Sequence, residues 1–143
     1  MVYNLEQIKQ ILPHREPILL VSTVEELVPG QEITTTFYVD PSMEIFKGHF
    51  PGNPVFPGVY TSEAMGQTTD ILFMVDPKYA GKVPLLLGNN NFRFKRMVKP
   101  GDTLVIKGKF LSERPEKAIV SAYLEAMVDG EVAVSGEVTI AMR

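Results

Sequence analysis

The chain has 143 residues and 45% of them are hydrophobic, which is enough for one sizeable core, so we expect a single domain over residues 1–143. The net charge of -3 argues against a general nucleic-acid binder, because phosphate binding needs a positively charged surface. Cysteine is absent, which excludes disulfides and thiolate metal sites and fits a reducing, cytoplasmic location. No apolar run approaches the ~20 residues that span a bilayer, so membrane insertion is not expected.

The hydrophobic pattern predicts helices and strands in a definite order. From the N-terminus we expect a short amphipathic helix over 4–12, strands over 17–28 and 33–39, a long helix over 57–75, and strands over 85–96, from 103 onward, over 118–128 and over 132–142. Pro29-Gly30 separates the first two strands, and Asp129-Gly130 is a strong two-residue hairpin signal between the last two.

The long helix over 57–75 decides between two arrangements. Its apolar residues fall on several sides of a helical wheel, and a helix of this kind is usually buried nearly all round. Half-buried antiparallel strands wrapped around such a helix make an α+β fold. A helix lying on an open, flat sheet is the alternative, but it would leave more of the apolar surface exposed.

The segment GHFPGNPVFPG, residues 48–58, is the stiffest in the chain, since prolines recur every third residue between glycines. A rigid connector is the simplest interpretation of such a loop. Two residues favour a site: His49 within the segment, and Glu63 in the second turn of a helix that is otherwise poor in charge. An imidazole can accept a proton near neutral pH, whereas desolvation and the helix N-terminus push Glu63 in opposite directions and leave its protonation open.

Gly58, at the start of the helix, adds a backbone N–H that can favour negative charge on a substrate carbonyl. A base, an acid and such a donor suit the removal of a proton beside a carbonyl with loss of a β-hydroxyl group. The carbon acid needs a base and a polarised carbonyl, and hydroxide leaves only when an acid protonates it. The residues themselves indicate this reaction class and nothing narrower.

The sequence GHFPGNPVFPGVYTSEAMGQ resembles the signature of the (3R)-3-hydroxyacyl-acyl-carrier-protein dehydratases of bacterial type II fatty acid synthesis, a family with the hot-dog fold. LPHREPILLV and FRFKRMVKPGDTL resemble two further motifs of this family, in the same order, so the resemblance covers essentially the whole chain. It implies a double hot-dog dimer, in some members a trimer of dimers, and formation of a trans-2-enoyl thioester without a metal or redox cofactor. The implied partner is an acyl carrier protein whose phosphopantetheine carries the 3-hydroxyacyl chain.

The resemblance also implies roles for individual residues. His49 would take the C2 proton, Glu63 would assist departure of the C3 hydroxyl group, and the Gly58 N–H would hold the thioester carbonyl. The His and the Glu of one site would come from different protomers. The residues expected near the substrate are Phe50, Phe56, Pro57, Val59 and Gln67. The sequence departs from the usual family pattern at Glu16, Ser22, Asn53 and Phe56, which bears on chain length and carrier contacts.

A basic run, Arg93, Lys95, Arg96 and Lys99, has two interpretations: a solvated strand face, or a dock for the acidic carrier protein and its phosphate. The other histidine, His14, is interpreted as structural, and no ligand spacing indicates a metal. Three alternative functions stay open: a dehydratase that also isomerises trans-2 to cis-3 enoyl chains, a hot-dog thioesterase, and a non-catalytic acyl-binding module.

Overall fold

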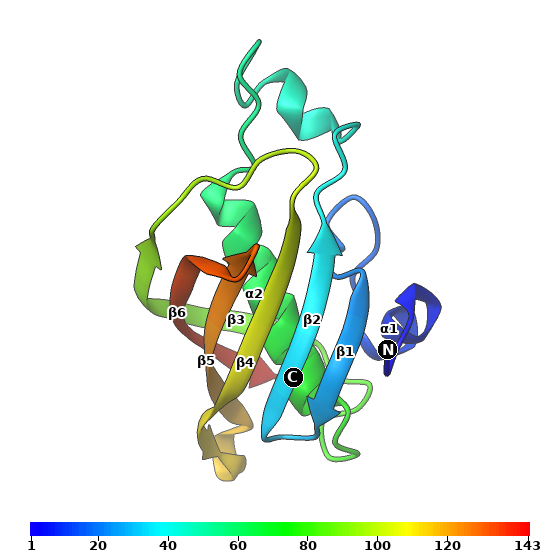
Figure 1. The fold of residues 1–143 in the computed structure, drawn as a ribbon. Coiled ribbons are helices and arrows are strands. Elements are labelled where there is room, and N and C mark those ends of the chain that lie inside the picture. Colours follow the sequence, from blue (N-terminus) through cyan, green and yellow to red (C-terminus); the bar gives the residue numbers. More distant parts are fainter.

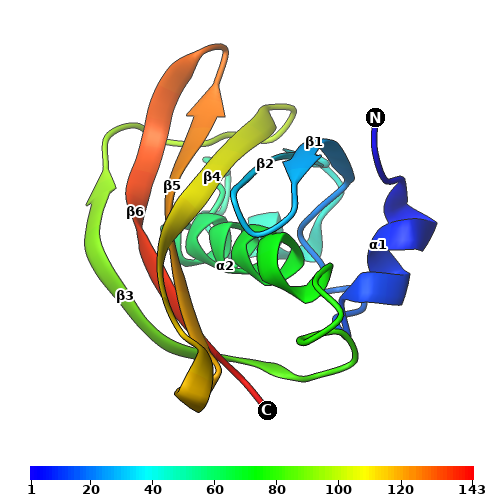
Figure 2. The same ribbon diagram turned by 90° about the horizontal axis from the view of Figure 1, so that it is seen from below.

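In the computed structural model, which describes residues 1–143, one antiparallel sheet curves around one long helix (Figures 1 and 2). The helices are α1 (Leu5–Ile11) and α2 (Gly58–Met74), with two short 3-10 helices, η1 (Glu44–Lys47) and η2 (Pro115–Lys117). The strands are β1 (Thr23–Val28), β2 (Glu32–Tyr38), β3 (Pro84–Phe94), β4 (Thr103–Arg114), β5 (Ile119–Val128) and β6 (Glu131–Met142). The strand order is β1-β2-β4-β5-β6-β3. The predicted α+β arrangement, a sheet wrapped around a helix, is confirmed.

The central helix α2 is buried because the sheet encloses it, as the view from below shows (Figure 2). Every residue from position 67 to position 74 is buried, and Ile71 and Leu72 have no exposed surface. The hydroxyl oxygens of Thr68 in α2 and Thr35 in β2 are 2.8 Å apart, so a buried hydrogen bond joins helix and sheet. Enclosure on most sides explains why α2 has no continuous polar face. Neither α1 nor α2 combines the length and the apolar character of a membrane-crossing helix.

The strand predicted over 17–28 is wrong in its first part, because β1 begins at Thr23 and residues 17–22 form a turn and a loop. The side chain of Gln67 explains the difference. Its Oε1 accepts a hydrogen bond from the Leu20 N–H at 2.8 Å, and its Nε2 donates to the Ile18 carbonyl at 2.7 Å. A helix side chain thus satisfies backbone groups that would otherwise need a neighbouring strand.

The β5–β6 hairpin confirms the predicted two-residue turn. Asp129 and Gly130 have φ angles of 51° and 76°, the left-handed backbone that a type I′ turn requires. Further along β6, a Cβ atom at Gly136 would overlap the ring of Phe92. Glycine at this position therefore lets the aromatic ring of β3 lie directly on the backbone of its neighbour.

The two edges of the sheet differ. Beside β1 the N-terminal segment pairs with the edge. The Tyr3 N–H donates to the Val24 carbonyl at 3.1 Å, and the Val24 N–H donates to the Tyr3 carbonyl at 3.0 Å. The other edge, β3, pairs only with β6. Its side chains Leu85, Leu86 and Leu87 are 49%, 56% and 55% exposed. An uncovered apolar edge strand is a surface on which another chain can pair.

Candidate active site

His49 lies in the loop between η1 and α2, which extends beyond the end of the sheet (Figure 1). Its Nδ1 is 2.8 Å from the carbonyl oxygen of Val55, and the Val55 N–H donates back to the His49 carbonyl at 3.0 Å. A carbonyl oxygen only accepts, so Nδ1 carries the proton and the neutral ring keeps a free lone pair on Nε2. The ring of Phe50, half exposed, stacks on the imidazole with centroids 4.0 Å apart.

Glu63 projects from the second turn of α2, where its side chain is 36% exposed. Gln67, one turn further on, donates to its Oε2 at 2.8 Å. The Gln67 amide is itself held by the loop backbone, so it fixes the orientation of the carboxyl group of Glu63. The Nε2 of His14 lies 3.8 Å from the same Oε2. His14, which the sequence analysis interpreted as structural, therefore stands beside the proposed acid.

The side chain of Glu63 lines a pocket of about 430 Å³ between α2 and β3. Asp70, two turns beyond Glu63 on the same side of α2, also lines this pocket, together with Leu86 and Asn89 of β3. Burial raises the pKa of Asp70 well above its ordinary value, and the charge of Glu63 adds to this rise. Burial lowers the pKa of His14, against the opposite influence of Glu63. The pocket is thus lined by two carboxyl groups, with Nε2 of His14 near both of them.

Gly58 begins α2, with Pro57 as the residue before the first helical turn. The first N–H groups of a helix have no acceptor within it, so the N–H of Gly58 is available to a ligand. A side chain at Gly58 would press against the ring of Phe94 at the end of β3. Val59, which is 71% exposed, lines the same pocket as Glu63. The predicted residues Gly58, Val59 and Glu63 are therefore gathered at one end of α2.

Phe56 lies elsewhere. It is only 2% exposed and packs among the rings of Phe37, Phe46 and Tyr60, at centroid distances of 6.0, 6.4 and 5.7 Å. Pro57 is buried next to it. These two residues support the base of the His49 loop, and a direct contact between Phe56 and a substrate would have to reach into the core.

Within one chain, no hydrogen bond or ion pair joins His49 to Glu63. His49 contacts its own loop, whereas Glu63 contacts Gln67 and His14 and lines a pocket to which His49 does not contribute. Sequence reasoning missed the position of His14 beside Glu63. For Asp70 the sequence leaves two options, a hydrogen bond near the site or exposure to water, and the structure places it in the pocket of Glu63. The seven-residue spacing from Glu63 to Asp70 is the signal that indicates a shared helix face.

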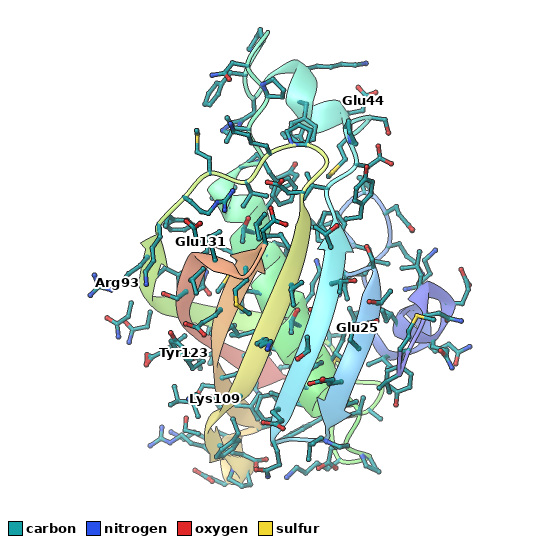
Figure 3. The ribbon with its side chains drawn as sticks, viewed as in Figure 1. Glu25, Glu44, Arg93, Lys109, Tyr123 and Glu131 are labelled. Atoms are coloured by element: carbon teal, nitrogen blue, oxygen red, sulfur yellow. The ribbon has the colours of Figure 1, made fainter.

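The predicted basic run begins near the end of β3 and continues into the segment after it. Arg93 is exposed and points away from the body of the molecule (Figure 3), and Lys95 and Lys99 are exposed as well. Arg96 differs, because its Nη1 lies 3.4 Å from Oε2 of Glu131, at the β5–β6 turn. Three of the four cations therefore lie free of ion pairs, on the side of the molecule where β3 ends.

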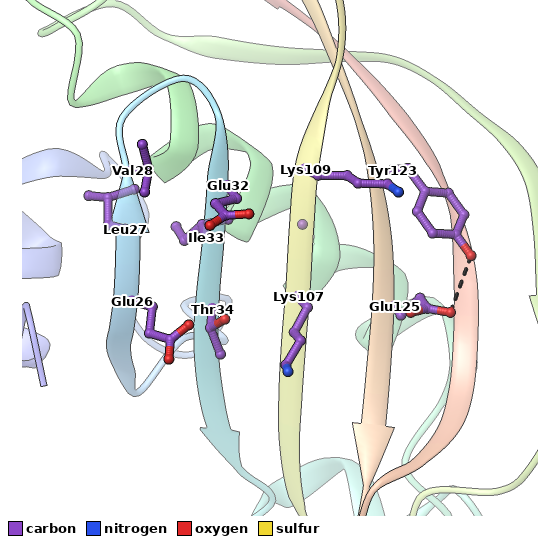
Figure 4. A pocket seen from close by; sticks show the side chains of 11 residues that line it. Glu26, Leu27, Val28, Glu32, Ile33, Thr34, Lys107, Lys109, Tyr123 and Glu125 are labelled. Atoms are coloured by element: carbon purple, nitrogen blue, oxygen red, sulfur yellow. Dashed lines mark hydrogen bonds between the residues drawn. The ribbon is translucent and has the colours of Figure 1, made fainter.

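A second pocket lies on the outer face of the sheet, away from α2 (Figure 4). Its side chains form rows across neighbouring strands: Glu32 faces Lys109, and Lys109 faces Tyr123. The ammonium group of Lys109 lies 5.7 Å from the centroid of the Tyr123 ring. Alternating charges across strands stabilise a solvated sheet face, and no proposed acid or base lies among them. This pocket has the character of a polar surface.

A curled antiparallel sheet around a buried helix defines a hot-dog protein. Solved structures share the fold. One is the dehydratase heterocomplex ApeI:P from Xenorhabdus doucetiae, at a TM-score of 0.80 and 20% identity over 95% of this chain and 90% of that one. Another is a hypothetical thioesterase protein with coenzyme A from Streptococcus pneumoniae, at a TM-score of 0.61 and 14% identity over 84% of each chain.

Residues 12–137 match the family model described as a FabA-like domain, so the chain belongs to this family. Its sequence is 40% identical to the 3-hydroxyacyl-[acyl-carrier-protein] dehydratase FabZ of Caldicellulosiruptor bescii, over 99% of this chain and 100% of that protein. The FabZ of Streptococcus thermophilus is 42% identical, over 99% of both chains. The chain is thus placed among the hydro-lyases of the family.

Proposed function

We propose that this protein dehydrates (3R)-3-hydroxyacyl thioesters carried on acyl carrier protein to trans-2-enoyl thioesters, as a step of fatty acid synthesis. The observation that supports this most is the fixed orientation of His49. Its Nδ1–H is held by the Val55 carbonyl at 2.8 Å, which leaves Nε2 as a base of known direction. The FabZ relatives, matched over nearly their full length, carry the name of this activity.

In the proposed reaction Nε2 of His49 takes the proton from C2 of the substrate. The electron pair of that C–H bond forms the C2–C3 double bond, and the C3–O bond breaks. Glu63 gives its proton to the departing hydroxyl group, so that water leaves. The N–H of Gly58 donates to the thioester oxygen and stabilises the charge that develops there. Transfer of a proton from the imidazolium of His49 back to Glu63 restores both groups for the next cycle.

The acid and the base of one site come from two chains in this proposal. Neither residue contacts the other within one chain, and the apolar strand β3, which lines the pocket of Glu63, has no partner on its outer side. Antiparallel pairing of β3 with β3 of a second copy would bury Leu85, Leu86 and Leu87 and bring each His49 loop toward the other chain. The functional unit is therefore proposed to be a dimer.

Mixing two inactive variants tests the shared site directly. His49→Ala and Glu63→Gln are each expected to lose nearly all enoyl formation. When they are mixed and allowed to exchange subunits, each mixed dimer has one site with both groups intact, so about a quarter of the wild-type activity should return. If the His and the Glu of one chain act together, mixing restores nothing, and the shared site is refuted. Activity retained in either single variant would refute the proposed chemistry itself.

The exposed cations Arg93, Lys95 and Lys99 are proposed to bind the acidic carrier protein, since a local basic patch can attract an acidic partner despite a negative total charge. Lys95→Glu should raise KM for carrier-bound substrate and leave turnover of the same acyl chain on N-acetylcysteamine unchanged. Lys82→Glu, also exposed but before β3, is the matched control. Equal effects of both substitutions on carrier-bound substrate would contradict the docking proposal.

The reaction product distinguishes a thioesterase from a dehydratase. A thioesterase releases a free thiol, whereas a dehydratase forms the conjugated enoyl thioester and keeps the thioester bond. The same assay identifies isomerisation, because a trans-2 enoyl substrate would then give the cis-3 isomer. We propose dehydration as the main activity because a hydrolase acting through Glu63 and water has no use for the fixed imidazole of His49.

A further inference from the structure

The pocket that Glu63 lines also contains a polar pair, His14 and Asp70, that the proposed reaction does not use. Nε2 of His14 lies 4.0 Å from Oδ2 of Asp70. The second polar atom of each side chain, Nδ1 of His14 and Oδ1 of Asp70, is buried without a hydrogen-bond partner. Asp70 as a whole is only 4% exposed. The two atoms that face each other, Nε2 of His14 and Oδ2 of Asp70, also make no hydrogen bond, and a gap of 4.0 Å leaves room for one ligand oxygen that bonds both.

The protonation states of His14 and Asp70 indicate which chemical class of ligand group they can bind. Burial raises the pKa of Asp70 and lowers the pKa of His14, so both shifts favour the neutral form of the side chain. A neutral carboxylic acid and a neutral imidazole each offer one donor and at least one acceptor. Such a pair suits a neutral hydroxyl or carbonyl group. Both groups accept a hydrogen bond, and a hydroxyl group also donates one. The pair does not suit a carboxylate or an ammonium group.

Asp70 lies further along α2 than Glu63. It follows Glu63 by seven residues on one face of the helix, which separates the two Cα atoms by about 10 Å along the axis. Nε2 of His14 lies near both carboxyl groups, 3.8 Å from Oε2 of Glu63 and 4.0 Å from Oδ2 of Asp70. A substrate whose C3 hydroxyl group lies at Glu63 extends its acyl chain from that point. The pocket between α2 and β3 runs from Glu63 to Asp70 and has room for such a chain, at about 430 Å³.

We propose that His14 and Asp70 bind an oxygen group on the distal part of the acyl chain, so that the site prefers an oxygenated chain over a saturated alkyl chain of equal length. This inference rests on the proposed dehydratase function and names its substrate class. An alkyl chain that reaches Asp70 covers Nε2 of His14 and Oδ2 of Asp70 without bonding them, whereas a hydroxyl or keto oxygen placed between these two atoms bonds both. A site built to hydrogen-bond a substrate group discriminates strongly against the analogue that lacks it.

The test compares pairs of 3-hydroxyacyl thioesters of N-acetylcysteamine, which removes any influence of carrier docking. Within each pair the chains have equal length, and one has a hydroxyl or keto group whose position is varied along the distal carbons. For the wild type we expect kcat/KM to favour the oxygenated chain by about tenfold or more at one position. Asp70→Leu should remove this preference and raise kcat/KM for the saturated chain. Asp70→Asn, which still donates and accepts, should keep the preference.

Two results would overturn the inference. One is a wild-type enzyme that prefers the saturated chain at every position of the oxygen group. This result does not depend on whether any variant folds. The other is an equal loss of kcat/KM for both members of each pair in Asp70→Leu, which indicates a purely structural role. Failure of the wild type to dehydrate any chain refutes the proposed function instead, so the two failures are distinguishable.

Discussion

Gln67 joins the loop before β1 to the proposed acid, and its replacement tests this connection. In Gln67→Leu the Leu20 N–H and the Ile18 carbonyl lose partners at 2.8 and 2.7 Å, and Glu63 loses its donor at 2.8 Å. Leaving a buried polar group without a partner costs about 1–3 kcal/mol, so two backbone groups together should lower the free energy of unfolding by about 3 kcal/mol. For a chain of this size the Tm should fall by roughly 10 °C.

Urea unfolding followed by circular dichroism measures this loss, and kcat for enoyl formation reports the orientation of Glu63. Thr69→Val is the matched control, because Thr69 is equally buried on α2 but its hydroxyl donates only to the Met65 carbonyl of its own helix. The control should lose about 1 kcal/mol and keep its kcat. If Gln67→Leu is no less stable than Thr69→Val, the loop does not depend on the glutamine, and the reasoning fails.

Two further predictions concern stability away from the site. Lys78 and Tyr79 hold the carboxylate of Glu113 at 2.8 and 2.6 Å and lower the pKa of Glu113 below its ordinary value of 4.5. Glu113→Gln should therefore have a lower Tm than the wild type at pH 7, and this difference should vanish as the pH falls through the lowered pKa of Glu113. Thermal melts at a series of pH values measure it, and a difference in Tm that stays constant with pH would contradict the prediction. Gly136→Ala should displace the Phe92 ring and cost about 2 kcal/mol, measured in urea.

The sequence was sufficient for the features that depend on residue spacing alone. The all-round apolar pattern of residues 57–75 predicted a helix enclosed by a sheet, and Asp129-Gly130 predicted its hairpin. The spaced motifs indicated a dehydratase family, and the match of residues 12–137 to the FabA-like domain confirms it. The same motifs singled out His49 and Glu63, whose roles stay a prediction. Periodicity shows which residues share a face of an element, and these features need no other information.

Features that depend on which faces meet were beyond the sequence. The loop over 17–22 has the composition of a strand, but the side chain of Gln67, distant in the chain, bonds its backbone. His14 resembles an ordinary core histidine until the fold places it against Glu63 and Asp70. Phe56 lies in the same loop as His49, yet its ring turns into the core. Long-range packing decided each of these cases.

The contrast between the two sheet edges limits how many copies can assemble through strand pairing. Tyr3 pairs with Val24 of β1 and α1 lies beside this edge, whereas β3 has no neighbour on its outer side (Figure 1). A chain with two open edges could add copies indefinitely and form fibres. In the proposed dimer the two β3 strands pair with each other, so the sheet could grow further only through β1. The N-terminal segment is expected to hinder that growth, because it occupies the backbone groups of Val24.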